Sequence, residues 1–370
     1  MNENQQTQEK LKVKKIFVAF YILAAVCFVI YLIARSIPAF ANFFNRYIAS
    51  VFRGILATLS GILPISVAEL LIICIPIILF VVIRIALKYY TADWHGVKIY
   101  CISLVSVVAL FFGVFVLTFG TGYYTSTLDQ RLDLDRQDVS ANELAATAEW
   151  LIENVNAEIN NVEFVEKSSS VMPYSIKDMS KHLMAAYEKV SDKYTFIPKL
   201  NSKIKPIMLS EPMTYTHISG VYTYFTGEAN LNTNSPDYCM PFTAAHEFAH
   251  QRGIAREDEA NFIAFLVCTE SDDPYIRYCG YLNLCEYVLN ALYRANNELW
   301  KETYLKLDSR AIYEMIAYNE FYEKYSDNVV GEISGAINDA YLQANGTQGS
   351  VSYGLVVDLA VAYFHKNIEN

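Results

Sequence analysis

The chain has 370 residues, 53% of them hydrophobic, and a formal net charge of −10 at pH 7. This length accommodates a membrane region and one sizeable domain. Residues 1–120 contain ten of the 29 Lys and Arg residues but only four of the 39 Asp and Glu residues, so the remainder is strongly acidic. A domain of this charge repels the phosphates of nucleic acid, so nucleic acid is not expected as a partner. The simplest explanation of the negative charge is that it keeps the domain soluble.

Three apolar runs, 16–34, 70–87 and 99–119, are long enough to cross a hydrocarbon core of about 30 Å. They predict a membrane region over 1–120, unless one run is instead a buried helix of the domain. The segment 36–66 is also apolar, but glycine and proline interrupt it, so we expect an interfacial or re-entrant segment there.

Lysine and arginine near the span ends predict the orientation. Four lysines precede the first span, and Arg84, Lys88 and Lys98 lie between the second and third spans. Both segments are therefore expected on the cytoplasmic side, in contact with cytoplasmic membrane lipids. Three spans then place residues 121–370 outside, as an extracytoplasmic domain of a multi-pass protein with its N-terminus inside.

The outer domain is predicted to be mostly helical with a small β-sheet, which gives a membrane-anchored α+β fold. Short β-branched and aromatic segments at 203–209 and 217–225 indicate strands or a hairpin. Apolar residues at helical spacing predict helices elsewhere. These helices are expected at 141–160, at 175–190, after Pro241, and at 258–268, 281–300, 310–324, 329–344 and 353–366.

The domain contains four cysteines and no C-x-x-C pair, so a structural zinc site made of cysteines is not expected. In an outer domain one or two disulfides are possible, and buried free thiols are the alternative. The four cysteines are Cys239, Cys268, Cys279 and Cys285.

The sequence FTAAHEFAH at 242–250 contains H-E-x-x-H, formed by His246, Glu247 and His250. Residues four apart share one face of a helix, so both imidazoles can bind one zinc ion. Glu247 is rotated by about 100° from His246 and can instead accept a proton from a zinc-bound water. This is the mechanism of metallopeptidases. The alternative is a core helix with two hydrogen-bonded histidines.

The third metal ligand is less certain from the sequence. One class of zinc proteases continues as H-E-x-x-H-x-x-G-x-x-H, but the last position here is Arg256, which does not bind zinc. Residues 257–259 are all acidic, and acids at a helix start are also favoured by the helix dipole. Glu259 lies one turn before Phe262 and should point inward with it, so we predict Glu259 as the ligand and Glu257 as the alternative.

The stretch TGEANLN…PFTAAHEFAHQRGIAREDEANFIAFL at 226–266, with GSVSYGLVVDLAVAYF at 349–364, resembles a family of bacterial membrane proteins of Firmicutes and Bacteroidetes, known only as a domain of unknown function. The resemblance implies membrane spans followed by a zincin-like domain in the bacterial cytoplasmic membrane. Glu259-Ala260-Asn261 is more distantly similar to the Glu-Ala-Asp of gluzincin peptidases, where the glutamate is the third ligand. This chain departs from that pattern in having Asn261 in place of the aspartate and a short gap between His250 and Glu259.

Further residues are candidates for binding a peptide or protein substrate. Glu228 and Asn230 follow a predicted strand, and an edge strand beside the metal helix can pair with an extended peptide. Tyr222, Tyr224 and His217 are candidates for stabilising a developing oxyanion.

Taken together, the sequence predicts a zinc-dependent metallopeptidase with Glu247 as the general base. The first alternative is a non-catalytic membrane receptor or sensor that retains a zinc site. The second is an intramembrane protease, but residues around the motif are too polar for lipid.

Overall fold

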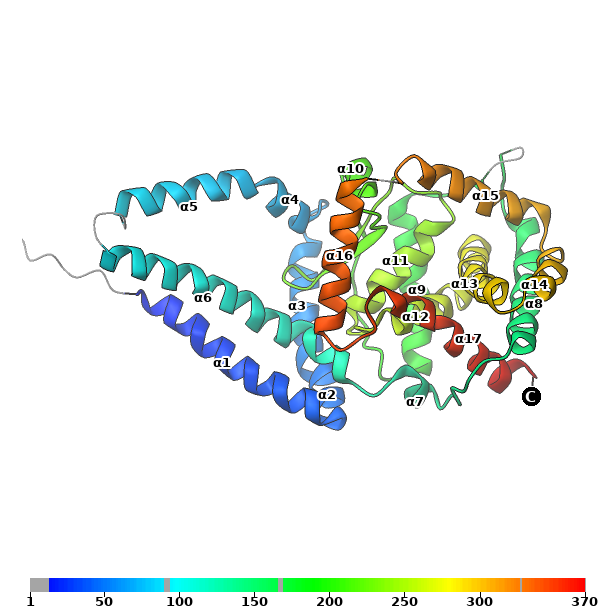
Figure 1. The fold of residues 1–370 in the computed structure, drawn as a ribbon, viewed down its shortest axis with the longest axis horizontal. Helices are drawn as coiled ribbons and strands as arrows, with labels where there is room; N and C mark the ends of the chain where they lie inside the picture. The colour runs from blue at the N-terminus through cyan, green and yellow to red at the C-terminus, as the bar shows by residue number, and fades with distance from the viewer. Residues whose placement is uncertain (1–12, 90–93, 166–168, 327, 370) are drawn as a thin grey trace, which may run out of the picture.

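The computed structural model describes residues 13–89, 94–165, 169–326 and 328–369 (Figure 1). Two of its helices, α1 (Lys15–Ser36) and α6 (Trp94–Thr118), are long and apolar enough to cross a membrane, and they pack side by side. A bent pair, α4 (Val67–Ile73) and α5 (Ile75–Tyr89), meets at 55° and counts as a third span only if the two helices are taken together.

The segment predicted to be interfacial folds as short helices against the rest of the protein. These are α2 (Pro38–Phe43), the π-helical η1 (Phe44–Ala49) and α3 (Ser50–Gly61). Lys205 of the sheet donates to the carbonyls of Ser60 and Leu63 at the end of this segment. The apolar composition of residues 36–66 therefore reflects packing against the domain as well as any contact with lipid.

A three-stranded sheet has the order β1-β3-β2. The strands are β1 (Lys205–Pro206), β2 (Gly220–Thr223) and β3 (Glu228–Leu231), with β3 parallel to β1 and antiparallel to β2. The two predicted strand segments contain β1 and β2, whereas β3 falls outside them. Because β3 is central, β2 is an edge strand.

The domain is mostly helical, as predicted. Ser140 caps the first long helix through a capping box with Glu143. The predicted helix at 281–300 is divided by Asn296, whose φ of −156° ends one helix while its side chain caps the next. The helices are α7 (Leu128–Leu132), α8 (Ala141–Glu158), α9 (Ile176–Lys193), α10 (Ser210–Thr214), α11 (Cys239–Gln251), α12 (Glu257–Thr269), α13 (Pro274–Ala295), α14 (Asn297–Tyr304), α15 (Ser309–Glu323), α16 (Val329–Ala344) and α17 (Val356–Phe364), with short turns η2 (Gly120–Tyr124), η3 (Ile159–Asn161), η4 (Gly349–Leu355) and η5 (His365–Glu369).

The centre of the domain is formed by α11, α12 and α13, with α8, α9 and α17 around them. Every residue of α12 from Glu257 to Cys268 is buried. The four cysteines of the domain are buried free thiols in this core. Helices α11 and α12 thus lie in the core of the domain.

Candidate metal centre

Helices α11 and α12 are joined by a tight turn that brings the start of α12 beside the end of α11. The N–H of Gly253 bonds to the carbonyl of His250, and that of Ile254 bonds to the carbonyl of Ala249. Gly253 has φ +90°, a conformation that side chains other than glycine rarely adopt. The chain therefore reverses in five residues, and Glu257, the first residue of α12, lies next to the last turn of α11.

Three buried side chains converge at this point. Oε2 of Glu257 lies 3.1 Å from Nε2 of His246 and 3.2 Å from Nε2 of His250. The ligand atoms of the three residues all lie within 4.8 Å of one another. This buried group could hold a metal ion.

Both imidazoles are held in the orientation that a metal site requires. Nδ1 of His246 lies 2.7 Å from Oδ1 of Asn261, and Nδ1 of His250 lies 2.7 Å from the carbonyl oxygen of Ile254. Both partners are acceptors, so each Nδ1 carries a hydrogen, and each Nε2, which faces Glu257, is the atom through which the ring would bind a metal ion. Asn261 lies one turn after Glu257 on α12, so one helix supplies both a ligand and an orienting group.

The charges of the three side chains also suit a cation. Burial opposes protonation of His250, but the Glu257 carboxylate outweighs it and raises the pKa of His250 to about 9. Burial likewise opposes ionisation of Glu257, yet the two imidazoles lower the pKa of this carboxyl far below its usual range. The carboxylate is therefore stable when positive charge, from a proton or a metal ion, lies among these groups.

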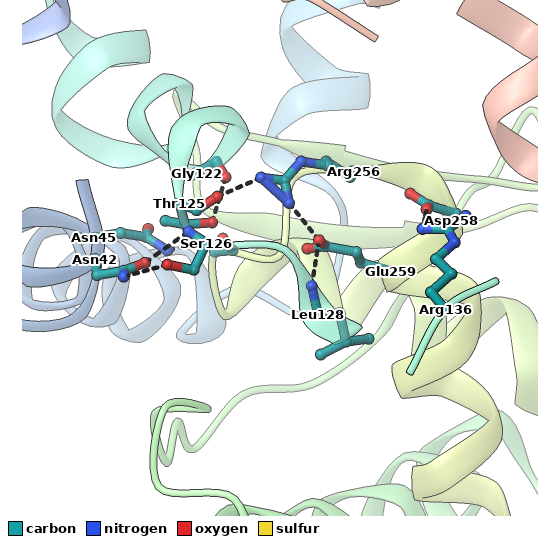
Figure 2. Close-up of polar contacts among 11 residues, drawn as sticks. Asn42, Asn45, Gly122, Thr125, Ser126, Leu128, Arg136, Arg256, Asp258 and Glu259 are labelled. Carbon is teal, nitrogen blue, oxygen red and sulfur yellow. Dashed lines mark hydrogen bonds and ion pairs between the residues drawn. The ribbon is translucent and has the colours of Figure 1, made fainter. Parts of the chain in front are cut away.

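The prediction of Glu259 as third ligand does not agree with this geometry. Oε1 of Glu259 accepts a hydrogen bond of 2.8 Å from the N–H of Leu128 and pairs with Arg256 (Figure 2). Two residues along a helix correspond to a rotation of about 200°, so Glu257 and Glu259 face opposite sides. All sides of α12 are buried. The position of Glu259 on the same side of the helix as Phe262 therefore did not show which side faces the histidines.

Asp258 and Glu259, the other acidic residues at the start of α12, contact residues of the segment that follows α6. Arg256 joins Glu259 to the carbonyl of Thr125, and Asp258 faces Arg136 at 3.5 Å (Figure 2). Only Glu257 of these three acids is therefore free to face the histidines.

A cavity of about 690 Å³ opens onto the group, lined by residues of α11, α12, α13, α15, α16, η2 and the segment 216–222. Glu247 lies in its wall, buried, with Oε2 lacking a hydrogen-bond partner among the described residues. Burial raises the pKa of Glu247, and the neighbouring imidazoles offset part of this effect. A Cβ built on Gly220 of β2 would lie 2.7 Å from Oε1 of Glu247, so only glycine allows β2 to approach the carboxylate this closely.

Two of the predicted substrate residues line this cavity. Tyr222 contributes to its wall, and its buried hydroxyl has no hydrogen-bond partner in the described part of the chain. His217 also lines the cavity, with Nε2 donating to the carbonyl of Tyr325 at 2.7 Å. Of the predicted oxyanion candidates, these two remain near the site.

The other three predicted substrate residues have structural contacts instead. The Glu228 carboxylate accepts hydrogen bonds of 3.0 and 2.9 Å from the N–H groups of Val67 and Ala68, which caps α4. Asn230 donates to the carbonyl of Val221 within the sheet, and Tyr224 packs against Phe115 of α6. None of Glu228, Asn230 and Tyr224 lines the cavity, because the strand that carries the first two is central in the sheet rather than at its edge.

Several cavity residues were not predicted. They come from α13, α15 and α16, which lie 30 to 90 residues beyond the histidines, so local sequence patterns carried no signal for them. Asn261 could have been identified from its spacing of four residues after Glu257. The unpredicted polar and aromatic residues are Asn283, Glu286, Tyr287, Asn290, Tyr318, Asn319, Tyr322, Asn338 and Tyr341.

A comparison with known families matches residues 44–361 to a protein of unknown function, DUF3810. Neither the curated proteins nor the solved structures provide a match. The matched range includes the segment 44–61 as well as His246, His250 and Glu257. The chain is therefore a member of the DUF3810 family.

Proposed function

We propose that the protein is a membrane-anchored zinc metallopeptidase whose ligands are His246, His250 and Glu257. The observation that carries this proposal is the convergence of two Nε2 atoms and one carboxylate oxygen beside the unpaired oxygen of Glu247. Two imidazoles and one carboxylate are a donor set of catalytic zinc, and three protein ligands leave a position open for water or substrate. Bound there, zinc would lower the pKa of a water and polarise a peptide carbonyl.

The residues of this chain then have separate tasks. Asn261 and the carbonyl of Ile254 hold the two imidazoles in place. Glu247 accepts the proton of the attacking water and passes it to the leaving amine. Burial raises the pKa of its carboxyl, which makes the carboxylate a stronger base. The edge strand β2 borders the cavity and offers its free side to an extended peptide. Tyr222 and His217 are the candidates for contacting the oxyanion.

The principal alternative is a membrane receptor or sensor with a zinc site but no catalysis. A structural zinc site normally closes with a fourth side chain. Among the described residues, the group contains three ligand side chains, and the acid next to them keeps an oxygen free. These features favour catalysis over a purely structural site.

The test uses the full chain purified in detergent. We expect about one zinc per chain and cleavage of peptides by the wild type. Glu247→Gln should retain zinc and lose cleavage, since an amide cannot accept the proton. A Glu247→Gln protein with undiminished cleavage would exclude the general-base role, and a zinc-loaded wild type that cleaves no peptide in a broad library would favour the receptor.

We also propose the predicted orientation, with the N-terminus inside the bacterial cytoplasmic membrane and the domain outside. The lysine-rich segment before α1 supports it. A reporter enzyme that is active only outside, fused after Asn370, should be active. An active cytoplasmic reporter at the same position would reverse the orientation.

A further inference from the structure

Helix α16 exposes a stripe of apolar side chains. Val330, Ile333 and Ile337 have exposed fractions of 54%, 56% and 66%, and Val329 has 67%. Spacings of three and four residues place the first three on one face of the helix. Single exposed apolar residues are normal, but a continuous stripe marks an interaction surface.

The polar side of α16 faces the protein. Gly331, Ser334, Gly335 and Asn338 line the cavity beside the metal group. A helix on the surface of a water-soluble domain has the opposite arrangement, with apolar residues inward. The inverted pattern indicates that the medium in contact with the apolar stripe is itself apolar.

The C-terminal end of α16 is attached where the span α6 ends. The ring of Tyr341 lies 6.4 Å from that of Phe115, in the last turn of α6, and its hydroxyl lies 3.2 Å from that of Tyr123 in η2. Figure 1 shows α16 crossing the end of α6 at a steep angle. If α6 spans the membrane, α16 lies at the depth of its boundary.

The turn between β2 and β3 reaches further along the same span. The ring of Phe225 lies 5.5 Å from that of Phe111, which is seven residues, or about 10 Å, before the end of α6. The hydroxyl of Thr118 donates to the carbonyl of the neighbouring Tyr224. Tyrosine is enriched at the membrane–water interface, so the position of Tyr224 beside the end of α6 suits a turn that lies at this boundary.

From these observations we propose that α16 is embedded in the membrane–water interface. Its apolar stripe, Val329, Val330, Ile333 and Ile337, contacts the acyl chains, and its opposite face forms a wall of the cavity. The sequence of α16 contains no Lys or Arg, so burial of apolar surface drives this contact and neutral phosphatidylcholine is a sufficient partner. The proposal goes beyond the proposed peptidase function and does not depend on it.

The experiment measures the depth of nitroxide labels on the full chain in phosphatidylcholine nanodiscs. Cys74→Ser and Cys101→Ser remove the two cysteines that are not buried, and the other five are buried. Labels are then attached at Ile333→Cys and, separately, at Ile337→Cys. Exposed controls are Glu332→Cys on the same helix and Glu323→Cys on α15.

Collisions of a label with oxygen show that it lies in lipid, because oxygen concentrates there. Collisions with a water-soluble nickel chelate show that the label lies in water. We expect oxygen to dominate at 333 and 337, several-fold relative to the two glutamate positions, where the nickel chelate should dominate. Nickel accessibility at 333 and 337 equal to that at 323 would overturn the proposal. Strong dipolar broadening between labels at 333 would assign the stripe to a second copy of the chain and overturn it as well.

A variant that perturbs the fold is recognised by its unfolding midpoint. If Ile333→Cys or Ile337→Cys lowers that midpoint, Val330→Cys on the same stripe replaces it with the same expectation. None of these measurements requires substrate or metal, so their failure is distinct from failure of the proposed catalysis.

Discussion

Arg53 lies against the turn that joins α11 and α12, the two helices of the candidate metal centre, and a Cβ built on Gly253 in that turn would lie 2.6 Å from its Nη2 atom. The guanidinium donates to the carbonyls of Thr118 and Arg252, and to both the side chain and the carbonyl of Asn45. Asn45 in turn donates to the carbonyl of Gly253 at 2.9 Å. Asn45 and Arg53, in the segment between the candidate spans, thus fix the turn that positions Glu257.

We predict that Gly253→Ala destabilises the protein and weakens metal binding. The residue has φ +90°, which costs a residue with a side chain about 1–3 kcal/mol, and the methyl group would also collide with Asn45 and Arg53. The measurements are the unfolding midpoint in detergent and the zinc content. The control is Gly335→Ala on α16, where a Cβ meets nothing within 4 Å and helix propensity should improve. Equal midpoints for wild type and Gly253→Ala would refute this account of the turn.

We predict that Glu257→Gln and Glu259→Gln have different effects. Glu257→Gln removes the carboxylate from the two imidazoles, so zinc content should fall to a small fraction of the wild-type value. Glu259→Gln leaves the half-buried Arg256 without its charge partner and weakens the hydrogen bond from the N–H of Leu128, so stability should fall by about 1–3 kcal/mol while zinc is retained. Mass spectrometry under native conditions and thermal unfolding separate the two effects.

An additional variant, Asp258→Asn, controls for loss of negative charge at the start of α12. Asp258 faces Arg136 rather than the histidines, so its zinc content should equal that of the wild type. Loss of zinc in Glu259→Gln, with Glu257→Gln unaffected, would return the ligand to the residue that the sequence favoured.

The sequence was sufficient to predict the elements whose signals are local. The spacing of His246 and His250 placed both on one helix face, and the serine cap predicted the start of α8. The choice between Glu257 and Glu259 depended on the angle at which α12 leaves the turn. That angle is set by Arg53 and Asn45, about 200 residues earlier, so no local pattern could reveal it.

The role of Glu228 also could not be predicted from local sequence. Its position after a strand suggested a substrate contact, but β3 is the central strand and the carboxylate caps α4 instead. In return, Glu69 of α4 accepts hydrogen bonds from the N–H groups of Met208 and Leu209, just before α10. These reciprocal contacts join segments more than 130 residues apart, and only the folded chain shows them.

We predict that Gly220→Ala reduces catalysis while zinc remains bound. The new methyl group would lie 2.7 Å from Oε1 and 2.8 Å from Cγ of Glu247, so the carboxylate must move, and a displacement near 1 Å can cost about 100-fold in rate. The readouts are peptide cleavage by the zinc-loaded protein and zinc content. Gly61→Ala, where a Cβ meets nothing within 4 Å and which does not line the cavity, should retain activity. Wild-type cleavage by Gly220→Ala would show that the position of Glu247 is not limiting.

Glu286 provides a test of pH dependence away from the metal ligands. It lies half-buried in the cavity wall, where the hydroxyl of Tyr238 donates to it at 2.8 Å. No Lys or Arg is among the described residues that line the cavity. Burial raises the pKa of Glu286 to about 7, and the hydrogen bond from Tyr238 offsets only part of this effect.

The sign of the effect follows from proton binding. At pH values between about 4.3, the ordinary pKa of glutamate, and about 7, Glu286 is protonated in the folded protein but ionised in the unfolded chain. The free energy of unfolding therefore falls as the pH rises through this range. Glu286→Gln keeps the hydrogen bond from Tyr238 and removes the titration. Its stability relative to wild type should therefore rise by about 1–2 kcal/mol between pH 5 and pH 8. Unfolding midpoints at the two pH values measure this, with Glu302→Gln on the exposed side of α14 as control. A difference from wild type that is the same at both pH values would show that Glu286 is ionised throughout.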